Sequence, residues 1–145
     1  MTKLFLKDMV MRDSGKILQL ASIAAKSSAP YMAVYGGTKA YIYNFTQALI
    51  SELKDSKVTV TALLPGPTAT DFFNKAGAQK AVVVQEGELA DPAAVALEGY
   101  TAMQSGESKV VCGWKYKMQT AMGNFMTDEA VADMARKQHE LSAKV

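Results

Sequence analysis

The segment 58–64, with the sequence VTVTALL, constrains the fold more than any other part of this chain. It is rich in β-branched residues, and apolar side chains fall on both of its faces, as in a parallel strand buried on both sides. Pro65 follows directly, and proline cannot donate a hydrogen bond to a sheet ladder. The segment therefore predicts a buried strand of a parallel sheet that ends before Pro65.

The rest of the chain alternates between strand and helix patterns. Asp91 and Pro92, for example, have the residue types of a helix N-cap and a first helical position. The alternation predicts a single α/β domain over residues 1–145, with a parallel sheet of about three strands and flanking helices. The expected strands are 16–21, 58–64 and 109–113, and the expected helices are 3–12, 34–55, 92–104, 115–126 and 128–140, with loop and short helical pieces over 68–90.

Composition excludes several classes of function. The net charge is +2 and no dense block of lysine or arginine occurs, so neither nucleic acid nor an anionic membrane is an expected partner. The N-terminus lacks a signal-peptide layout, no apolar run reaches membrane-spanning length, and the single cysteine agrees with a reducing cytosol. We therefore expect a soluble cytoplasmic chain. We expect no structural metal site, because one histidine and one cysteine cannot form one.

Three polar side chains lie at positions that suit proton transfer. Tyr35 and Lys39 are four residues apart, so they share one face of the helix predicted over 34–55. Ser22 follows the strand predicted over 16–21, and ligands bind at the carboxyl ends of parallel strands. An ammonium group near a phenol favours the phenolate, and a serine hydroxyl can bind the reacting oxygen. The cluster therefore predicts acid–base chemistry on a carbonyl or an alcohol.

The same residues also have a structural interpretation, which spacing alone leaves open. Tyr-x-x-x-Lys is a short motif, and a chain with six tyrosines and fourteen lysines matches it readily by chance. In that interpretation Tyr35 begins a core helix, Lys39 is solvated and Ser22 caps a loop. The ordered set of strand, serine, Tyr-x-x-x-Lys, strand and Pro-Gly is a more specific signal than the motif by itself.

Three segments in this order resemble the short-chain dehydrogenase/reductases, which are nicotinamide-dependent oxidoreductases with a Rossmann-type fold. Residues 15–25 look like the family's strand leading to its catalytic serine, and Tyr35 to Lys39 matches its Tyr-x-x-x-Lys motif. Residues 65–70 look like its Pro-Gly segment. The resemblance implies that Ser22 positions a substrate carbonyl, that Tyr35 delivers its proton and that Lys39 assists.

The resemblance also implies a cofactor, NAD or NADP, and the residues that hold it. Lys39 would bond the nicotinamide ribose, and two threonines would lie near the nicotinamide and phosphate side. The substrate would be a small-molecule carbonyl or alcohol, with Phe72 and Phe73 lining an apolar pocket. The implied cofactor-binding residues are Tyr35, Lys39, Pro65, Gly66, Thr68 and Thr70.

One feature of the family is missing from this sequence. None of the ten glycines forms G-x-G-x-x-G or G-x-x-x-G-x-G, the turn that brings backbone against a pyrophosphate. The chain therefore looks like the C-terminal half of such an enzyme, with a partial Rossmann-type three-layer fold. From this we expect a first strand with an exposed edge, helices that sandwich the sheet but are themselves covered on one side only, weak dinucleotide affinity and a homo-oligomer.

Two other functions compete with the oxidoreductase. A non-catalytic remnant of the family would fold and associate through the helix 34–55, which resembles the family's dimerisation helix. A sugar-nucleotide epimerase or dehydratase shares the Tyr-x-x-x-Lys motif. The short C-terminal region argues against it, because a second substrate domain has no room there.

Two further patterns have structural interpretations. Met118, Met122 and Met126 recur every four residues, and we interpret them as core rather than as the wall of a substrate pocket. Gly36 and Gly37 stand in the first turn of a predicted helix, where each costs roughly 1 kcal/mol relative to alanine. Small residues there would let a cofactor or a neighbouring strand approach closely.

Overall fold

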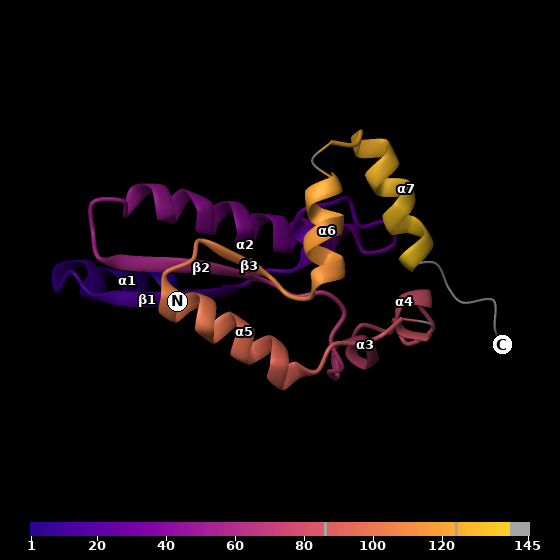
Figure 1. Cartoon of the computed structure of the whole chain (residues 1–145), viewed down its shortest axis with the longest axis horizontal. Coiled ribbons are helices and arrows are strands. Elements are labelled where there is room, and N and C mark those ends of the chain that lie inside the picture. Colours follow the sequence, from indigo (N-terminus) through magenta and orange to yellow (C-terminus); the bar gives the residue numbers. More distant parts are fainter. Residues whose placement is uncertain (86, 124, 140–145) are drawn as a thin grey trace.

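A three-stranded parallel sheet forms the centre of the molecule (Figure 1). Its strands lie in the order β1 (Gly15–Leu20), β2 (Val58–Leu64) and β3 (Lys109–Val111). The predicted bounds of β2 are confirmed, whereas β1 ends one residue and β3 two residues earlier than predicted. The computed structural model describes residues 1–85, 87–123 and 125–139.

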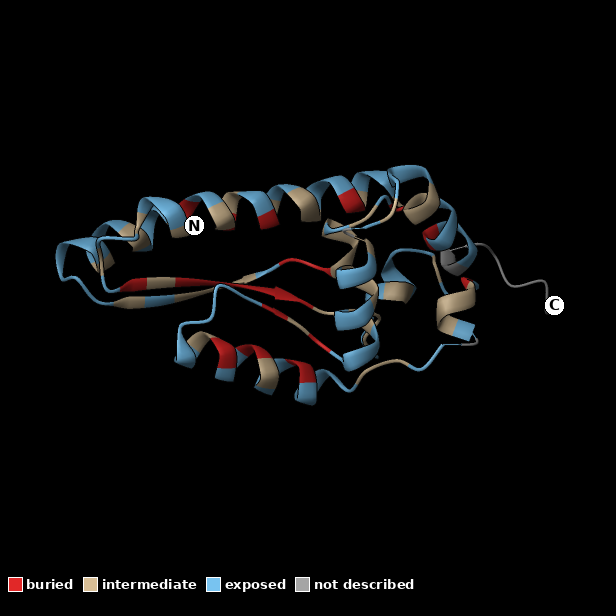
Figure 2. Cartoon of the chain, turned by 45° about the horizontal axis from the view of Figure 1, so that its top comes forward, coloured by how far each residue is buried: buried red, intermediate tan, exposed pale blue. Residues whose placement is uncertain are grey.

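Helices cover both faces of this sheet. α2 (Ala33–Glu52) lies on one face and α5 (Pro92–Ser105) on the other (Figures 1 and 2). Alternate side chains of β2 point to opposite faces, and each set joins a separate core cluster. The three-layer arrangement expected from the sequence is therefore confirmed. The cluster under α2 contains Ala21, Tyr43, Ala62 and Leu64, and the cluster under α5 contains Leu63, Val95, Ala102, Val110 and Cys112.

The two crossover connections of the sheet have opposite hands. Both connections step in the same direction, from β1 to β2 and from β2 to β3, but their helices α2 and α5 lie on opposite faces. One of the two is therefore left-handed, which is rare in parallel sheets. Gly99 lets α5 pack closely here, because a Cβ at this position would lie 2.7 Å from the buried Leu63 Cδ2.

The remaining helices gather at two places (Figure 1). α1 runs beside β1, and the others surround the carboxyl ends of the strands, where α4 packs against α7. Residues 82–85 are helical, in agreement with the short helical pieces expected over 68–90. No helix in the described part of the chain is long and apolar enough to cross a membrane. The helices other than α2 and α5 are α1 (Thr2–Met11), η1 (Ile23–Ala25), α3 (Phe72–Lys75), α4 (Val82–Gln85), α6 (Trp114–Gly123) and α7 (Asp128–His139).

The outer edge of β1 has no strand partner within the described residues. α1 lies next to it, and Gln19 Nε2 of β1 donates a hydrogen bond to Thr2 Oγ1 at 2.8 Å. α1 has no buried residue, and its Leu4 and Phe5 side chains are exposed. An unpaired edge beside an exposed apolar helix can pair with another chain, as expected from the sequence.

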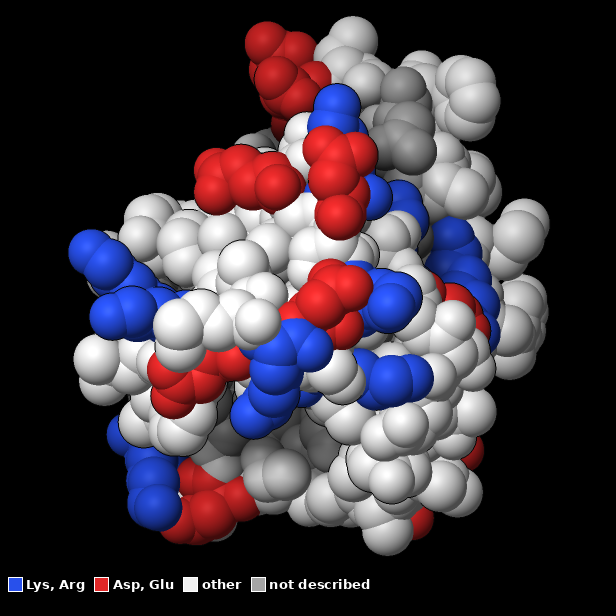
Figure 3. All heavy atoms as spheres, turned by 90° about the vertical axis from the view of Figure 1, so that its left-hand side faces the viewer, with Lys and Arg blue, Asp and Glu red and all other residues white. Residues whose placement is uncertain are grey.

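Asp13 lies in the turn before β1 and is hydrogen-bonded to the turn before β2, at the end of the molecule opposite the carboxyl ends of the strands. Its Oδ1 accepts hydrogen bonds from the Lys57 backbone N–H at 2.8 Å and from Ser56 Oγ at 3.1 Å. These bonds hold the Asp13 pKa below its usual range. Figure 3 views this end and shows basic and acidic side chains interspersed over it.

Candidate active site

Ser22 lies just beyond the end of β1 and is only 7% exposed. It is the N-cap of η1, and its Oγ accepts a hydrogen bond from the Ala24 N–H at 3.2 Å. A hydroxyl can accept and donate at once, and within the described residues Ser22 donates to no protein group. Its proton therefore remains available for a ligand oxygen, while the cap holds the side chain in place.

Lys39 joins α2 to the carboxyl end of β1. Its Nζ donates a hydrogen bond to the main-chain oxygen of Leu20, the last residue of β1, at 3.0 Å. The same Nζ lies 5.7 Å from the centre of the Tyr35 ring. Partial burial removes water from the ammonium group and lowers the Lys39 pKa. The cation is thus held beside the phenol by a bond to the sheet rather than left solvated.

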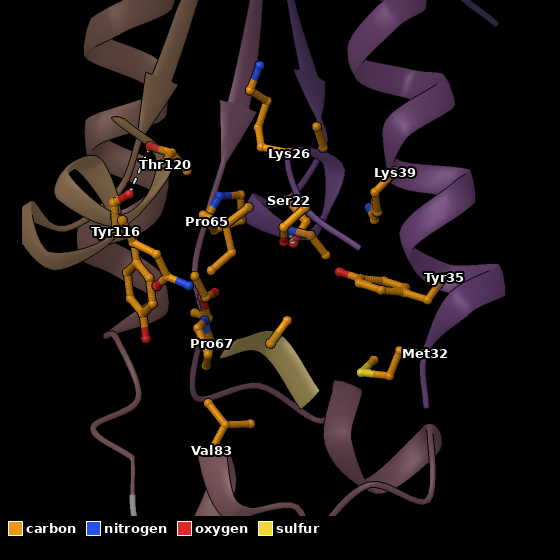
Figure 4. Close-up of a pocket in the computed structure, with 18 of the residues that line it drawn as sticks. Ser22, Lys26, Met32, Tyr35, Lys39, Pro65, Pro67, Val83, Tyr116 and Thr120 are labelled. Carbon is orange, nitrogen blue, oxygen red and sulfur yellow. Dashed lines mark hydrogen bonds between the residues drawn. The ribbon is translucent and has the colours of Figure 1, made fainter. Parts of the chain in front are cut away.

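Tyr35 points from α2 toward Ser22. Figure 4 shows its hydroxyl end directed at the serine, with Lys39 on the same side of the cavity. Its ring also packs against Phe72, with the ring centres 5.2 Å apart. Side chains from the end of one strand and from one helix face therefore meet in the arrangement that their spacing predicts.

Gly36 sets the distance between α2 and the loop that leads to it from Ser22. A Cβ at Gly36 would lie 2.9 Å from the Ala29 Cβ, whereas a Cβ at Gly37 would meet nothing within 4 Å. The close approach at Gly36 is thus to a loop residue, and the expected approach of a strand is not found. Close packing at Gly36 fixes where the helix carrying Tyr35 begins.

The turn after β2 is fastened to the turn after β1. The Pro65 carbonyl accepts a hydrogen bond from the Ile23 N–H at 3.1 Å. Further along, Thr68 Oγ1 donates to the Gly66 carbonyl at 2.9 Å, and Thr68 pairs with Ala90 in an isolated parallel bridge. Both turns therefore keep a fixed relation at the carboxyl edge of the sheet.

Gly66 lies directly under an aromatic ring of α6. A Cβ at Gly66 would collide with the Tyr116 ring, so only glycine fits between this ring and the turn. Burial and the nearby Glu88 carboxylate raise the Tyr116 pKa. Thr70, at the end of the same turn, accepts a hydrogen bond from the Phe72 N–H at 3.4 Å.

A single cavity of about 890 Å³ joins these parts. Every site residue predicted from the sequence lines it, namely Ser22, Tyr35, Lys39, Pro65, Gly66, Thr68 and Thr70. Phe72 and Phe73 line it as well, as expected. Figure 4 shows the cavity open between α2 on one side and α6 on the other. It lies at the carboxyl ends of the strands, where parallel α/β sheets bind their ligands.

The charged side chains described as lining this cavity are all positive. The charged side chains among its described lining residues are Lys26, Lys39 and Lys115, and no carboxylate is among them. In the described part of the chain, no three histidine, cysteine or acidic side chains are grouped as metal ligands would be. The arrangement can therefore attract an anionic ligand and exchange a proton with its reacting group.

Comparison with known families decides the class of protein. The profile of the short chain dehydrogenase family matches residues 1–81, which is more than half of this chain. The chain belongs to the short chain dehydrogenase family. It is 36% identical over 78 residues to a 3-oxoacyl-[acyl-carrier-protein] reductase from Synechocystis, covering 54% of this chain and 32% of that protein. It is 39% identical over 74 residues to a probable NADP-dependent dehydrogenase from Haemophilus influenzae, covering 50% of this chain and 29% of that protein.

Solved structures of short chain dehydrogenases share its fold. An enzyme from Burkholderia cenocepacia in complex with NADP superposes with a TM-score of 0.73 at 21% identity, over 93% of this chain and 52% of that chain. A 3-oxoacyl-[acyl-carrier protein] reductase from Brucella melitensis with bound NAD gives a TM-score of 0.59 at 30% identity, over 77% of this chain and 44% of that chain. The chain thus spans about half the length of these relatives.

Sequence reasoning missed one wall of the candidate site. α6 and α7 line the cavity with side chains that include Trp114, Met118 and Met122. The interpretation of the methionines as core is wrong, because Met118 and Met122 are 56% and 55% exposed and face the cavity. Their four-residue spacing was the available signal, but a helix face turned to a core has the same spacing.

Proposed function

We propose that this chain carries the catalytic residues of an NAD- or NADP-dependent oxidoreductase that interconverts a carbonyl compound and a secondary alcohol. The observation that supports this most strongly is the meeting of Ser22, Tyr35 and Lys39 in one cavity at the carboxyl edge of the sheet. The oxidoreductase names of the relatives agree with it and do not favour a non-catalytic remnant.

In this proposal Ser22 and Tyr35 act on the oxygen of the substrate, and Lys39 acts on Tyr35. Ser22 donates its free hydroxyl proton in a hydrogen bond to the carbonyl oxygen and so orients it. Tyr35 transfers its phenolic proton to the same oxygen as the alcohol forms, and takes it back in the reverse direction. Lys39 stabilises the resulting phenolate, because its ammonium group is held beside the ring.

The nicotinamide cofactor supplies the hydride that this proton transfer accompanies. The residues present fit its nicotinamide and ribose end, since the cavity offers side-chain hydroxyl groups and the Lys39 ammonium as hydrogen-bond partners for ribose hydroxyls and an amide. Lys39 and Tyr35 would hold the ribose, and the segment from Pro65 to Thr70, with Gly66 and Thr68, would lie beside the nicotinamide.

We propose weak dinucleotide affinity for the 145-residue chain, because its glycines form no turn for the pyrophosphate. That the chain is the C-terminal half of a longer enzyme stays a prediction. Titration of the purified chain with NADH and with NADPH checks the affinity, and a micromolar dissociation constant for either would contradict this part of the proposal.

Association into a homo-oligomer also belongs to the proposal. The unpaired edge of β1 and the exposed Val34 and Tyr41 of α2 are surfaces that a second copy can cover. The partners would otherwise be small carbonyl or alcohol compounds, and a cytoplasmic location stays a prediction.

Replacement of Tyr35 by phenylalanine tests the acid–base role. The variant Tyr35→Phe keeps the ring and its packing but removes the exchangeable proton, so turnover should fall by about 10²- to 10⁴-fold, whereas the cofactor loses only the hydrogen bond of this hydroxyl. Tyr41→Phe is the matched control, because Tyr41 is on the same helix, 70% exposed and outside the cavity. Oxidation of reduced nicotinamide with a panel of ketones is the assay. A wild-type rate in Tyr35→Phe would remove this tyrosine from the mechanism.

A further inference from the structure

Both C-terminal helices line the cavity, and α6 lies across it from Tyr35. Figure 4 shows Tyr116 and Thr120 of α6 on the far side of the cavity from Tyr35. α6, α7 and the connection between them add apolar side chains to the cavity lining. We refer to four of these as the methionine wall: Met118, Met122, Met126 and Met134.

The methionine wall is apolar surface that the protein itself does not cover. Met118 and Met122 are one helical turn apart on α6, and both are more than half exposed although they line the cavity. Met134 of α7 is 42% exposed and lines it too. Covering apolar surface with an apolar ligand is favourable, so these side chains form a binding surface rather than part of the core.

Methionine side chains also decide how selective such a wall can be. They are unbranched and flexible, and their thioether sulfur is polarisable, so they adapt to ligands of differing outline. Phe72 and Phe73 of α3 add aromatic surface to the same cavity and pack edge-to-face, with their ring centres 5.3 Å apart. The wall therefore suits an apolar group of variable shape.

The size of the cavity favours a bulky ligand. Its volume of about 890 Å³ is more than a short carbonyl compound and the nicotinamide end of a cofactor fill together. Ser22 and Tyr35 line the cavity from the end of β1 and from α2, while the methionine wall lines it from α6, α7 and the connection between them. A ligand with its oxygen at Tyr35 covers the wall only when it has an apolar body that extends across the cavity.

We propose that this cavity takes a ketone, or the corresponding secondary alcohol, with a bulky apolar body, and that the methionine wall binds this body. The inference rests on the proposed function, because Ser22 and Tyr35 place the oxygen. A short carbonyl compound leaves the wall uncovered and binds more weakly. Affinity therefore rises with the apolar size of the ligand.

Trp114 provides a direct measurement of this binding. It is the single tryptophan of the sequence and lines the cavity, so its fluorescence reports a ligand there. The purified chain is titrated with 2-undecanone and with acetone, without cofactor. We expect a saturable change with 2-undecanone at a dissociation constant at least tenfold lower than for acetone. No saturable change up to the solubility limit of 2-undecanone would overturn the proposal.

Substitution of the methionine wall locates the binding. The pair Met118→Gln and Met122→Gln keeps the side-chain length but adds polarity, and we expect it to weaken 2-undecanone binding about tenfold. The pair Met118→Leu and Met122→Leu should bind as the wild type does. Met11→Gln is the matched control, because Met11 of α1 is 70% exposed and outside the cavity. Unchanged affinity in the glutamine pair would contradict the proposal, and the single Met122→Gln variant carries the test if that pair unfolds.

Two outcomes separate this inference from its alternatives. Binding of 2-undecanone without any turnover at concentrations of NADH or NADPH that saturate the chain would leave the apolar site intact and refute the proposed reaction. A second copy of this chain covering the wall would instead make the glutamine pair a smaller assembly than the wild type by light scattering, with ketone affinity unchanged. That result would overturn the inference.

Discussion

The two adjacent glycines of α2 give a sharp test of the packing around the site. Gly36 is buried against Ala29, whereas Gly37 is exposed with open space around it. Replacing either by alanine brings the same gain in helix propensity, about 0.8–1 kcal/mol. The difference between Gly36→Ala and Gly37→Ala therefore isolates the cost of the contact with Ala29.

That cost can be worked from the geometry. A Cβ at Gly36 would be 2.9 Å from the Ala29 Cβ, and ordinary contact begins at 3.4 Å, so the loop and the helix must separate by about 0.5 Å. Ala29 is buried and Gly36 is in a helix, so neither can simply rotate away. Overpacking of this kind costs about 1–3 kcal/mol. We expect Gly37→Ala to stabilise the chain by up to about 1 kcal/mol and Gly36→Ala to be about 1–3 kcal/mol less stable than Gly37→Ala.

Urea unfolding followed by circular dichroism measures both variants against the wild type. Equal stabilisation by the two substitutions would refute the reasoning, because it would mean that the loop before α2 yields without cost. The same loop separates Ser22 from Tyr35, so a shift at Gly36 is expected to lower turnover as well, while Gly37→Ala leaves turnover unchanged.

Two further predictions concern residues with left-handed backbone. Folding lowers the pKa of Asp13, so the ionised carboxylate stabilises the folded chain. This stabilisation is complete above the ordinary aspartate pKa and is lost as the pH falls through the lowered value. The melting temperature of the wild type should therefore exceed that of Asp13→Asn at neutral pH and converge with it in acid; a difference that grows in acid would contradict this. Tyr31 has φ 64° and an exposed side chain at the cavity, so Tyr31→Gly should raise the free energy of unfolding by roughly 1 kcal/mol in urea titrations. A loss of stability in Tyr31→Gly would show that its ring makes contacts worth more than the strain.

Local patterns were enough to predict most of the elements. β2 has the predicted bounds, because a β-branched run favours a strand and Pro65 cannot continue the sheet ladder. α5 begins at Pro92 as predicted, since Asp91 caps it by accepting a hydrogen bond from the Ala94 N–H. The end of α2 was predicted three residues too late, because no cap or breaker in the sequence marks Glu52 as its last residue.

The site was predictable to the extent that it depends on spacing. Tyr35 and Lys39 share a helix face, and Ser22 follows a strand, so their meeting needs only a parallel sheet with a helix beside it. The wall formed by Met118 and Met122 was not predictable. An apolar helix face has the same period whether a core or a cavity lies opposite to it.

By itself, the sequence determined which segments are strands and helices and which three polar groups meet at the end of the sheet. These properties follow from periods of two and 3.6 residues and from spacing along the chain. Only the tertiary structure decided that α2 and α5 cover opposite faces and that α6 and α7 close the cavity. The choice of face depends on packing between residues far apart in sequence, such as Gly99 against Leu63, and no local pattern records such contacts.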